Sequence, residues 1–344
     1  MMKALVYEGD HRLVLTEKER PVIEDERDVI LKVTLCTICS SDIHIKHGAV
    51  PKAVPGTTLG HEFVGEVVEK GSGVKRVKIG DRVAVNVETF CGECFYCKQG
   101  FVNNCTDQNG GWALGCRIDG GQAEYVRIPL ADQGLTLIPE HVTDRQALFV
   151  GDILSTGYWA AKLGELKPAQ TVAVIGAGPT GLCTMMCARL YSPAKIIAID
   201  TDESRLELAK EKGLADVTLV PGKDEICDAI QSMTEGRGAD VVFEVAGAPD
   251  TFQMAWEIAR PNAIVVVVAM YEVLLLPKMY GKNLTFKTGG VDGSYCQEIM
   301  DLIACGKLDT EFMLTHKSSL DEILEAYDIF EGKKDHVIKI AVTP

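Results

Sequence analysis

The first 150 residues consist of short apolar runs separated by turn residues. Residues 28–35 (DVILKVTL), 62–71 (EFVGEVVEKG) and 81–87 (DRVAVNV) are rich in Val, Ile and Thr, and Gly, Pro and Asp punctuate the sequence between such runs. Helical periodicity is weak in this part of the chain. Short β-branched runs bounded by turn residues are typical of strands. This part of the sequence therefore predicts an all-β domain.

From about Thr171 the pattern changes, because apolar runs begin to alternate with amphipathic segments. TVAVIG is followed by PTGLCTMMCARLY, KIIAID by DESRLELAKEKG, and DVVFEVAG by PDTFQMAWEIA, before a last apolar run at residues 263–270. Runs that are apolar on both faces suit buried strands of a parallel sheet, with the amphipathic segments as helical crossovers. We expect a doubly wound α/β domain here.

The C-terminal segment carries two further helical patterns and one strand pattern. Residues 297–305 and 319–330 have helical spacing, and residues 336–342 (HVIKIAV) have the pattern of a strand. The chain passes from the first domain to the second near residues 152–161. The expected ranges are a first domain over residues 1–153, a second domain over 154–293, and a return to the first domain over 294–344.

Composition and charge exclude several classes of protein. A chain of 344 residues is long enough for two domains, and 47% apolar with 24% charged residues is ordinary for a globular protein. The net charge of −14 disfavours nucleic acid and anionic lipid as partners. The apolar run at 263–270 is far shorter than the ~20 residues that span a bilayer, and the N-terminus lacks the apolar core of a signal peptide. We expect a cytoplasmic protein with neither nucleic acid nor membrane as a partner.

Four of the twelve cysteines are clustered in one segment. Cys91, Cys94, Cys97 and Cys105 have the spacing C-x2-C-x2-C-x7-C. Four thiolates can complete a tetrahedral zinc site, which leaves no position for a substrate, so this zinc would be structural. An iron–sulfur cluster is the alternative, because ferredoxin-like spacings also contain C-x2-C-x2-C. The following x7 spacing and the absence of a Cys-Pro pair favour zinc.

A glycine-rich motif lies between the first strand and the first helix of the expected α/β domain. In TVAVIGAGPTGL, Gly176, Gly178 and Gly181 have the spacing G-x-G-x-x-G. Such glycines let the backbone approach a pyrophosphate at a helix N-terminus. Asp200 follows 19 residues after Gly181, where a carboxylate accepts hydrogen bonds from ribose hydroxyls and repels a 2′-phosphate, so NAD is preferred over NADP. Arg205 could hold such a phosphate, or it could lie along the adenine.

Three separated segments offer ligands for a second zinc. Residues 36–44 (CTICSSDIH) contribute a thiolate, residues 59–66 (LGHEFVGE) contribute His61, and residues 150–158 (VGDILSTGY) contribute Asp152. A catalytic zinc keeps three protein ligands and leaves the fourth position for water or substrate. There it could polarise an alcohol and prepare it for hydride transfer to a nicotinamide. Taken singly, each of these residues is more typical of a turn or of the core than of a zinc ligand.

These motifs together resemble one family. CSSD, GHE, the four-cysteine loop, GAGPTG and DILSTGY stand in the order and spacing of the zinc-dependent medium-chain alcohol dehydrogenases, over essentially the whole chain. The chain looks most like the bacterial secondary-alcohol dehydrogenases, because Asp152 replaces the second Cys of the liver-type branch. The resemblance implies a GroES-like β-barrel catalytic domain and a Rossmann domain with a doubly wound parallel sheet.

The resemblance also implies the ligands of the catalytic zinc. Cys39, His61 and Asp152 would bind it, and Glu62 would be an adjacent or exchanging ligand. Cys36 would not bind, because the family's ligand is the Cys followed by x-[ST]-D, as in residues 39–42.

By the same resemblance, a proton relay lies on the CSSD segment. Ser41 would hydrogen-bond the substrate oxygen and take its proton, and His44 would pass that proton towards solvent. Asp42 would orient His61, and Trp112 would lie against the alkyl groups of the substrate. The alternative is that residues 41–42 form a turn, that His44 is a solvated surface residue and that Trp112 belongs to the core.

The expected cofactors are one catalytic zinc, one structural zinc and NAD. Pro179 and Thr180 of the glycine motif and Thr156 of DILSTGY are also expected to bind the nicotinamide cofactor, by resemblance.

The expected reaction is the reversible oxidation of a small secondary alcohol to its ketone, with hydride transfer to NAD. Two alternatives remain open at this point. One is a polyol, 2,3-butanediol or threonine dehydrogenase of the same family, and the other is a cofactor-binding relative with little catalysis. The resemblance further implies a homo-oligomer, either a tetramer or a dimer.

Overall fold

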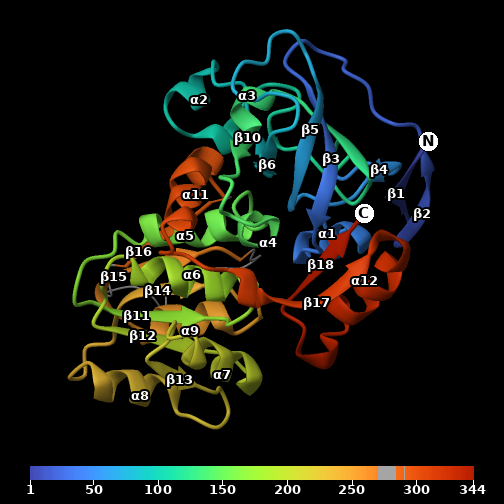
Figure 1. Ribbon diagram of the computed structural model, residues 1–344. Helices are drawn as coiled ribbons and strands as arrows, with labels where there is room; N and C mark the ends of the chain where they lie inside the picture. Colours follow the sequence, from blue (N-terminus) through green and yellow to red (C-terminus); the bar gives the residue numbers. More distant parts are fainter. Residues whose placement is uncertain (270–283, 290) are drawn as a thin grey trace. The chain divides into compact units, whose positions relative to one another are not determined.

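The computed structural model describes residues 1–269, 284–289 and 291–344 (Figure 1). It divides into two compact units, one of residues 1–155 with 291–344 and one of residues 156–290. Residues 270–283 and 290, which belong to the second range expected from the sequence, lie outside the described residues, as does the last residue of the run at 263–270. No helix in the described ranges is long and apolar enough to cross a membrane.

The first unit is built on a seven-stranded sheet. Its order is β10-β6-β5-β3-β18-β17, with β9 also paired to β3, and all pairs are antiparallel except β17 with β18. In Figure 1 the C-terminal strand β18 lies beside the N-terminal strand β3, as their pairing requires. The strands are β3 (Val29–Cys36), β5 (Phe63–Lys70), β6 (Arg82–Val85), β9 (Tyr125–Ile128), β10 (Leu135–Leu137), β17 (Leu314–Ser319) and β18 (Lys339–Thr343).

Two smaller sheets and several short helices complete this unit. A three-stranded sheet has the order β2-β1-β4, and β7 pairs with β8. These strands are β1 (Met2–Gly9), β2 (Arg12–Lys18), β4 (Thr57–Thr58), β7 (Glu88–Thr89) and β8 (Gly111–Trp112). The α-helices are α1 (Ser40–Lys46), α2 (Phe95–Lys98), α3 (Ala131–Gly134), α4 (Asp144–Ala147), α11 (Cys296–Ala304) and α12 (Ile323–Glu331). The 3₁₀-helices are η1 (Val102–Asn104), η2 (Gly293–Tyr295), η3 (Glu311–Met313), η4 (Leu320–Glu322) and η5 (Lys334–His336).

The core of the first unit joins the two ends of the chain. Leu31 and Val33 of β3 are buried while Lys32 between them is exposed, because successive residues of a strand point to opposite faces. Ile323 and Tyr327 of the C-terminal helix α12 are buried in the same hydrophobic cluster. The first 155 residues and the last 54 therefore share one core.

The second unit contains a six-stranded parallel sheet. Its order is β13-β12-β11-β14-β15-β16, which is the doubly wound arrangement expected from the sequence. The strands are β11 (Thr171–Ile175), β12 (Lys195–Ile199), β13 (Val217–Leu219), β14 (Ala239–Glu244), β15 (Ala259–Val267) and β16 (Thr285–Thr288). The helices are α6 (Pro179–Arg189), α7 (Glu203–Glu211), α8 (Ile226–Met233) and α9 (Thr251–Ile258), and α5 (Ile153–Leu163) begins in the first unit. The order reverses beside β11, and the glycine motif follows that strand.

Two expected elements differ from the structure at their N-terminal ends. The final strand begins at Lys339 and not at residue 336, because residues 334–336 form η5, with positive φ at Lys333 and Asp335. The helix expected over 319–330 begins as the 3₁₀-helix η4, because Ser319 still belongs to β17. The sequence patterns did not single out β13 and α8.

Candidate functional site

The structure brings Cys39, His61 and Asp152 together in the first unit. Cys39 is the N-cap of α1, His61 lies just before β5, and Asp152 lies just before α5. One donor atom from each lies within 4.8 Å of the others. The Cys39 Sγ is 3.7 Å from Asp152 Oδ2, which is 3.3 Å from His61 Nε2. Three residues that lie far apart in the sequence therefore form one cluster.

This donor cluster fits a tetrahedral zinc ion. Zinc bonds of about 2.0–2.3 Å place neighbouring ligand atoms about 3.3–3.7 Å apart, and the observed separations agree. A sulfur, a nitrogen and an oxygen converge in a buried position, and such donors are those that zinc prefers. Within the described residues the group has three members, which is the number that leaves one position of a tetrahedron for a further ligand.

The three donors also perturb one another electrostatically. Burial raises the pKa of the Cys39 thiol. Burial opposes the charged imidazole of His61, but the charge of Asp42 and contacts with Asp152 raise its pKa well above the usual value. Burial alone would raise the pKa of Asp152, but its hydrogen bond to His61 and the charge of His61 hold it below the usual value. Negative and polar groups thus converge on one point, where they would stabilise a bound cation.

Asp42 connects the segments that carry two of these donors. Its Oδ1 lies 3.2 Å from Nδ1 of His61, a close contact whose angle is outside hydrogen-bond geometry. Its Oδ2 accepts the backbone N–H of Cys39 at 2.9 Å and the side-chain amide of Gln122 at 3.3 Å. A fully buried carboxylate therefore holds the thiolate segment and the imidazole at once.

The structure adds Gln122 and Tyr327 to this network, and the sequence analysis missed both. The hydroxyl of Tyr327 donates to Oε1 of Gln122 at 2.8 Å, and the amide of Gln122 also donates to the carbonyl of Thr37 at 3.1 Å. Tyr327 comes from α12, so the C-terminal segment supports the donor cluster. A Gln in the Gly- and Ala-containing run GGQAEY was the only local signal.

Glu62 lies beside the donor cluster but is paired with Lys339. The two side chains form a buried ion pair, and Nζ of Lys339 also donates to the carbonyl of Ile38 at 3.1 Å. Burial disfavours the ammonium, but the charges of Cys39 and Glu62 raise the pKa of Lys339. The sequence analysis missed Lys339, whose only signal was a lone charge within an apolar strand. Glu62 is not a member of the three-donor group.

Ser41 and His44 lie one helical turn apart on α1. The hydroxyl of Ser41 is 3.9 Å from Sγ of Cys39, and His44 is exposed. Residues three apart share one face of a helix. The structure thus places the hydroxyl at the donor cluster and the imidazole in solvent, with no direct hydrogen bond between them among those described.

Trp112 packs against His61 of the donor cluster and is paired in register with a buried glutamate. Its ring meets the ring of His61 edge to face, with 5.5 Å between the centroids and 68° between the planes. Glu88 lies directly opposite Trp112 in the β7–β8 pair. Burial, together with the charges of Asp292 and Asp152, raises the pKa of Glu88 to about 8. The sequence analysis missed Glu88, because a Glu before a Thr carries no local signal.

The four cysteines of the loop also converge. Their sulfur atoms lie within 4.8 Å of one another, and Sγ of Cys91 is 3.6 Å from that of Cys105 and 4.0 Å from that of Cys97. Four thiolates bound to one zinc at about 2.3 Å lie about 3.8 Å apart, so this geometry fits a closed tetrahedral site.

Backbone N–H groups point at the sulfur atoms of this loop. The N–H of Cys94 donates to Sγ of Cys91 at 3.3 Å, and that of Cys91 donates to Sγ of Cys105 at 3.3 Å. Hydrogen bonds from backbone N–H groups lower the pKa of Cys94 to about 6. Burial raises the pKa values of Cys97 and Cys105. Donors aimed at the sulfur atoms favour the thiolate form that binds metal.

The glycine motif in the second unit has the geometry of a tight strand-to-helix turn. Gly176 has a φ of +104°, which L-residues with a side chain rarely adopt. A Cβ on Gly181 would lie 1.9 Å from the carbonyl oxygen of Gly176, so a side chain is excluded there. Gly178 is the N-cap of α6, and Pro179 and Thr180 open that helix. The free N–H groups of this turn fit an anionic phosphate.

Asp200 and Arg205 both lie at this turn. Asp200 follows β12, and its carboxylate accepts the N–H of Ala177 at 2.6 Å and that of Asp202 at 2.9 Å. Arg205 lies 3.5 Å from Asp202 and 3.5 Å from the position of a Cβ on Gly178. The acid thus ties the end of β12 to the glycine motif. Thr156, also expected at the cofactor, is a partly exposed residue of α5.

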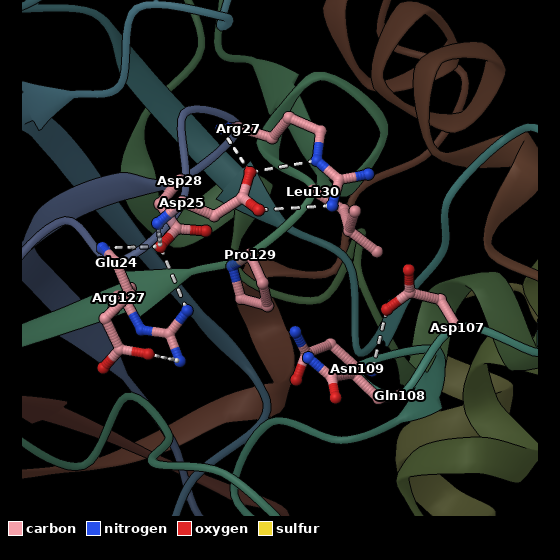
Figure 2. Close-up of a pocket in the computed structure, with 10 residues that line it drawn as sticks. All are labelled: Glu24, Asp25, Arg27, Asp28, Asp107, Gln108, Asn109, Arg127, Pro129 and Leu130. Atoms are coloured by element: carbon pink, nitrogen blue, oxygen red, sulfur yellow. Dashed lines mark hydrogen bonds and ion pairs between the residues drawn. The ribbon is translucent and has the colours of Figure 1, made fainter.

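A polar pocket of about 220 Å³ lies elsewhere in the first unit, and Figure 2 shows its lining. The carboxylate of Asp28 accepts the N–H groups of Glu24 and Asp25 and the guanidinium of Arg127, and Arg27 pairs with Asp25. These charges are paired with one another, and none of the expected site residues lines the pocket. It therefore does not compete with the donor cluster as a candidate active site.

Two family models match the chain. Residues 25–140 match the alcohol dehydrogenase GroES-like domain, and residues 179–305 match the zinc-binding dehydrogenase family. The first range lies in the unit that holds both donor clusters, and most of the second range lies in the unit with the glycine motif.

Individual proteins agree with these matches. The chain is 35% identical to zinc-type alcohol dehydrogenase B of Aspergillus flavus, over 97% of this chain and 79% of that protein. Its structure matches zinc-dependent alcohol dehydrogenase 2 from Streptococcus pneumonia with a TM-score of 0.93 and 36% identity, over 100% and 98% of the two chains. It also matches 2R,3R-butanediol dehydrogenase from Bacillus subtilis with a TM-score of 0.87 and 28% identity, over the whole of both chains.

The fold expected from the sequence, a GroES-like domain with a Rossmann domain, is confirmed by these matches and by the parallel sheet of the second unit. An alcohol substrate, zinc and a nicotinamide cofactor follow from the same matches. The chain therefore belongs to the zinc-dependent medium-chain alcohol dehydrogenase family.

Proposed function

We propose that this protein oxidises a small secondary alcohol reversibly to its ketone and transfers the hydride to NAD. The observation that carries the proposal is the convergence of Cys39, His61 and Asp152 in a buried group of three donors. Asp152 in place of a second Cys supports the secondary-alcohol branch, and the indole of Trp112 against His61 supports a small substrate.

In this proposal Cys39, His61 and Asp152 hold the catalytic zinc. When bound, the zinc acts as a Lewis acid that polarises the alcohol oxygen. Asp42 keeps the imidazole of His61 oriented, since it contacts Nδ1 and leaves Nε2 for the metal. The ammonium of Lys339 offsets the negative charge of the thiolate and of Glu62. Glu62 is adjacent to the site and stays a candidate for an exchanging ligand.

Ser41 and His44 move the proton of the alcohol. The hydroxyl of Ser41, close to Cys39, accepts the proton of the substrate and donates its own. His44 on the same face of α1 is exposed and can exchange that proton with water. The remaining step between them is carried by a hydroxyl or a water molecule, since the two side chains share no described hydrogen bond.

The second unit binds the cofactor, and we propose that it prefers NAD. The N–H groups at the start of α6 face the pyrophosphate, and residues 176–181 let it approach. Asp200 already accepts two backbone N–H groups, but a carboxylate has about four acceptor positions and can also bind the ribose hydroxyls. Its charge opposes a 2′-phosphate, whereas the guanidinium of Arg205, which lies beside Asp202, would attract one. Thr156 contributes a hydroxyl from α5.

The four-cysteine loop binds a second, structural zinc in this proposal. The support is the tetrahedral spacing of the sulfur atoms and the N–H groups that point at them. A cytoplasmic location and a homotetramer or homodimer stay predictions.

Polyol, 2,3-butanediol and threonine dehydrogenases are the alternative within the family, and a weakly catalytic relative is the alternative outside it. The structural match to a butanediol dehydrogenase supports the first alternative. The complete set of three donors weighs against the second.

The decisive experiment assays the purified, zinc-replete protein with secondary alcohols, primary alcohols and diols, each with NAD and with NADP. We expect reduced NAD with secondary alcohols and two zinc atoms per chain by mass spectrometry. Absence of turnover with every secondary alcohol would overturn the substrate class, and a higher kcat/KM with NADP would overturn the role of Asp200. One zinc per chain with NAD binding but no turnover would favour the weakly catalytic relative.

A further inference from the structure

The ammonium of Lys339 is buried between two segments that each carry a proposed zinc ligand. Lys339 is only 1% exposed, forms an ion pair with Glu62, and donates to the carbonyl of Ile38 at 3.1 Å. Glu62 directly follows His61 in the sequence, and Ile38 directly precedes Cys39. One cation therefore connects the chain beside the imidazole to the chain beside the thiolate.

The carboxylate of Glu62 has one oxygen that none of the described residues binds. Its Oε2 pairs with Lys339, whereas its Oε1 is buried without a hydrogen-bond partner in the described part of the chain. Buried polar atoms in folded proteins are almost always bound, so this oxygen requires an explanation. Besides burial, the charge of Asp152 raises the pKa of Glu62, against the opposing charge of Lys339. Glu62 therefore lies within electrostatic range of a proposed zinc ligand.

A carboxylate without a restraint at this place would compete for the metal. Zinc binds carboxylate oxygens at about 2.0–2.2 Å, and four protein ligands make the closed tetrahedral site that is typical of a structural zinc. With Glu62 added, the three-donor cluster would have as many ligands as the four-cysteine loop. No position would then remain for an alcohol, so an open site requires a contact that keeps Glu62 from binding.

The surroundings of Lys339 suit it to this restraint. The centroids of the Phe149 and Phe330 rings lie 5.8 and 5.9 Å from its Nζ, and aromatic rings attract an ammonium placed over them. A hydrogen bond between two charged groups is strong where the local dielectric is low. Separating such a buried pair leaves a charge without compensation. Glu62 therefore stays with the ammonium unless the metal offers it a better partner.

We propose that Lys339 is a positioning residue that holds Glu62 away from the zinc and so keeps the fourth ligand position open for the alcohol. Lys339 acts through Glu62 and takes no part in hydride or proton transfer. This inference rests on the proposed alcohol dehydrogenase function. It predicts that Glu62 becomes a zinc ligand when the ammonium is removed.

The test uses the protein with cobalt(II) in the three-donor site, because the absorption spectrum of cobalt reports its coordination. Pyrazole is the probe, since it is a neutral nitrogen ligand whose binding depends little on the charge of neighbouring groups. We expect pyrazole to bind to the wild type and to change its spectrum. In Lys339→Met, both the affinity for pyrazole and kcat/KM with a secondary alcohol should fall by about tenfold or more.

A double variant identifies Glu62 as the cause. Lys339→Met with Glu62→Gln has the net charge of the wild type and lacks the competing carboxylate. Its affinity for pyrazole should return to within about threefold of wild type, and its kcat/KM should exceed that of Lys339→Met. The control is Lys317→Met, at an exposed lysine on β17, which should leave both quantities unchanged.

The zinc affinity separates this role from a merely structural one. Loss of a structural contact would lower the affinity of the three-donor site for zinc in Lys339→Met, whereas a fourth ligand would keep or raise it. Competition with a chelator measures this affinity, and the melting temperature of each variant reports its folding. A zinc affinity that falls together with the melting temperature would contradict the inference.

Other results would also overturn the inference. One is a Lys339→Met protein that binds pyrazole as tightly as wild type, and another is a loss of binding that the double variant does not restore. If Lys339→Met does not fold, Lys339→Gln replaces it, since the amide can still donate to the carbonyl of Ile38. Failure of both variants to fold would assign Lys339 to stability alone. If no alcohol is oxidised, the proposed function fails, whereas the pyrazole measurement still decides the inference.

Discussion

The two donor clusters of the first unit are built in opposite ways. The four-cysteine cluster comes from one loop of fifteen residues, and its cysteines are partly exposed. The three-donor cluster joins segments that lie up to 113 residues apart, and all three residues are largely buried. One cluster has four ligands of one kind, and the other has three of different kinds.

This difference indicates which cluster performs chemistry. A closed set of four thiolates has no position for a substrate, so we propose that its effect is limited to the conformation of the loop. A set of three donors supported by Asp42, Gln122 and Tyr327 keeps a position open and holds its geometry through the core of the domain. The density of reactive groups in the sequence is therefore a poor guide to the active site.

The largest effect is expected for Cys39→Ala. Loss of one of three ligands should lower kcat/KM by about 10³-fold or more and reduce the zinc content from two to one per chain. Enzyme assays and metal analysis of the same preparation measure both quantities. The matched control is Cys36→Ala, three residues away on β3, which should keep both zinc atoms and lose about 1 kcal/mol of stability. Equal loss of activity in both variants would contradict the ligand assignment.

Asp42→Asn should affect the three-donor cluster and leave the four-cysteine cluster unchanged. The amide keeps the shape of the side chain but loses the charge that contacts Nδ1 of His61 and the strength of its bond to Cys39. We expect the affinity for one of the two zinc atoms to fall by about 10–100-fold, with the other unchanged. Competition with a chelator measures this. A parallel loss of both zinc atoms would show that Asp42 acts on the fold as a whole.

His44→Ala should reduce the rate without affecting either metal. A side chain that exchanges the proton with water contributes about tenfold to kcat in this position, and added imidazole should restore part of the loss. Zinc content should stay at two per chain. His47→Ala, at the C-cap of the same helix and paired with Glu331, is the control and should change kcat by less than twofold. A loss that imidazole does not restore would assign His44 a structural role.

The smallest effect on activity is expected for Cys94→Ala. The variant should lose the loop zinc and melt about 5–10 °C lower, because the metal stabilises the folded loop. The activity of the molecules that remain folded should stay within about twofold of wild type. Calorimetry and assays below the melting temperature test this. A stable, folded Cys94→Ala protein without activity would reverse the assignment of the two clusters.

Local sequence patterns were sufficient to predict part of the structure. The apolar runs at 28–35 and 62–71 are β3 and β5, and the strand-to-helix turn of residues 176–181 has the conformation that its glycines require. The convergence of the four cysteines was also predictable, because all four lie within fifteen consecutive residues. In each case the neighbours that set the geometry are close in sequence.

The resemblance to a family carried the sequence analysis further than the patterns did. Cys39, His61 and Asp152 have no common local signal, and only their order within known motifs joined them before the structure showed them within 4.8 Å of one another. The roles of Ser41, His44 and Asp200 stay predictions that the experiments above address.

By itself, then, the sequence determined the strands, the glycine turn and the cysteine loop, because short-range spacing dictates their geometry. Only the tertiary structure decided what surrounds the three-donor cluster. Lys339 is the first residue of β18, which pairs with β3, and it is buried against Glu62. Helix α12 brings Tyr327 to Gln122, and the β7–β8 register sets Glu88 opposite Trp112. These contacts depend on which distant segments pack together, and no local pattern encodes that choice.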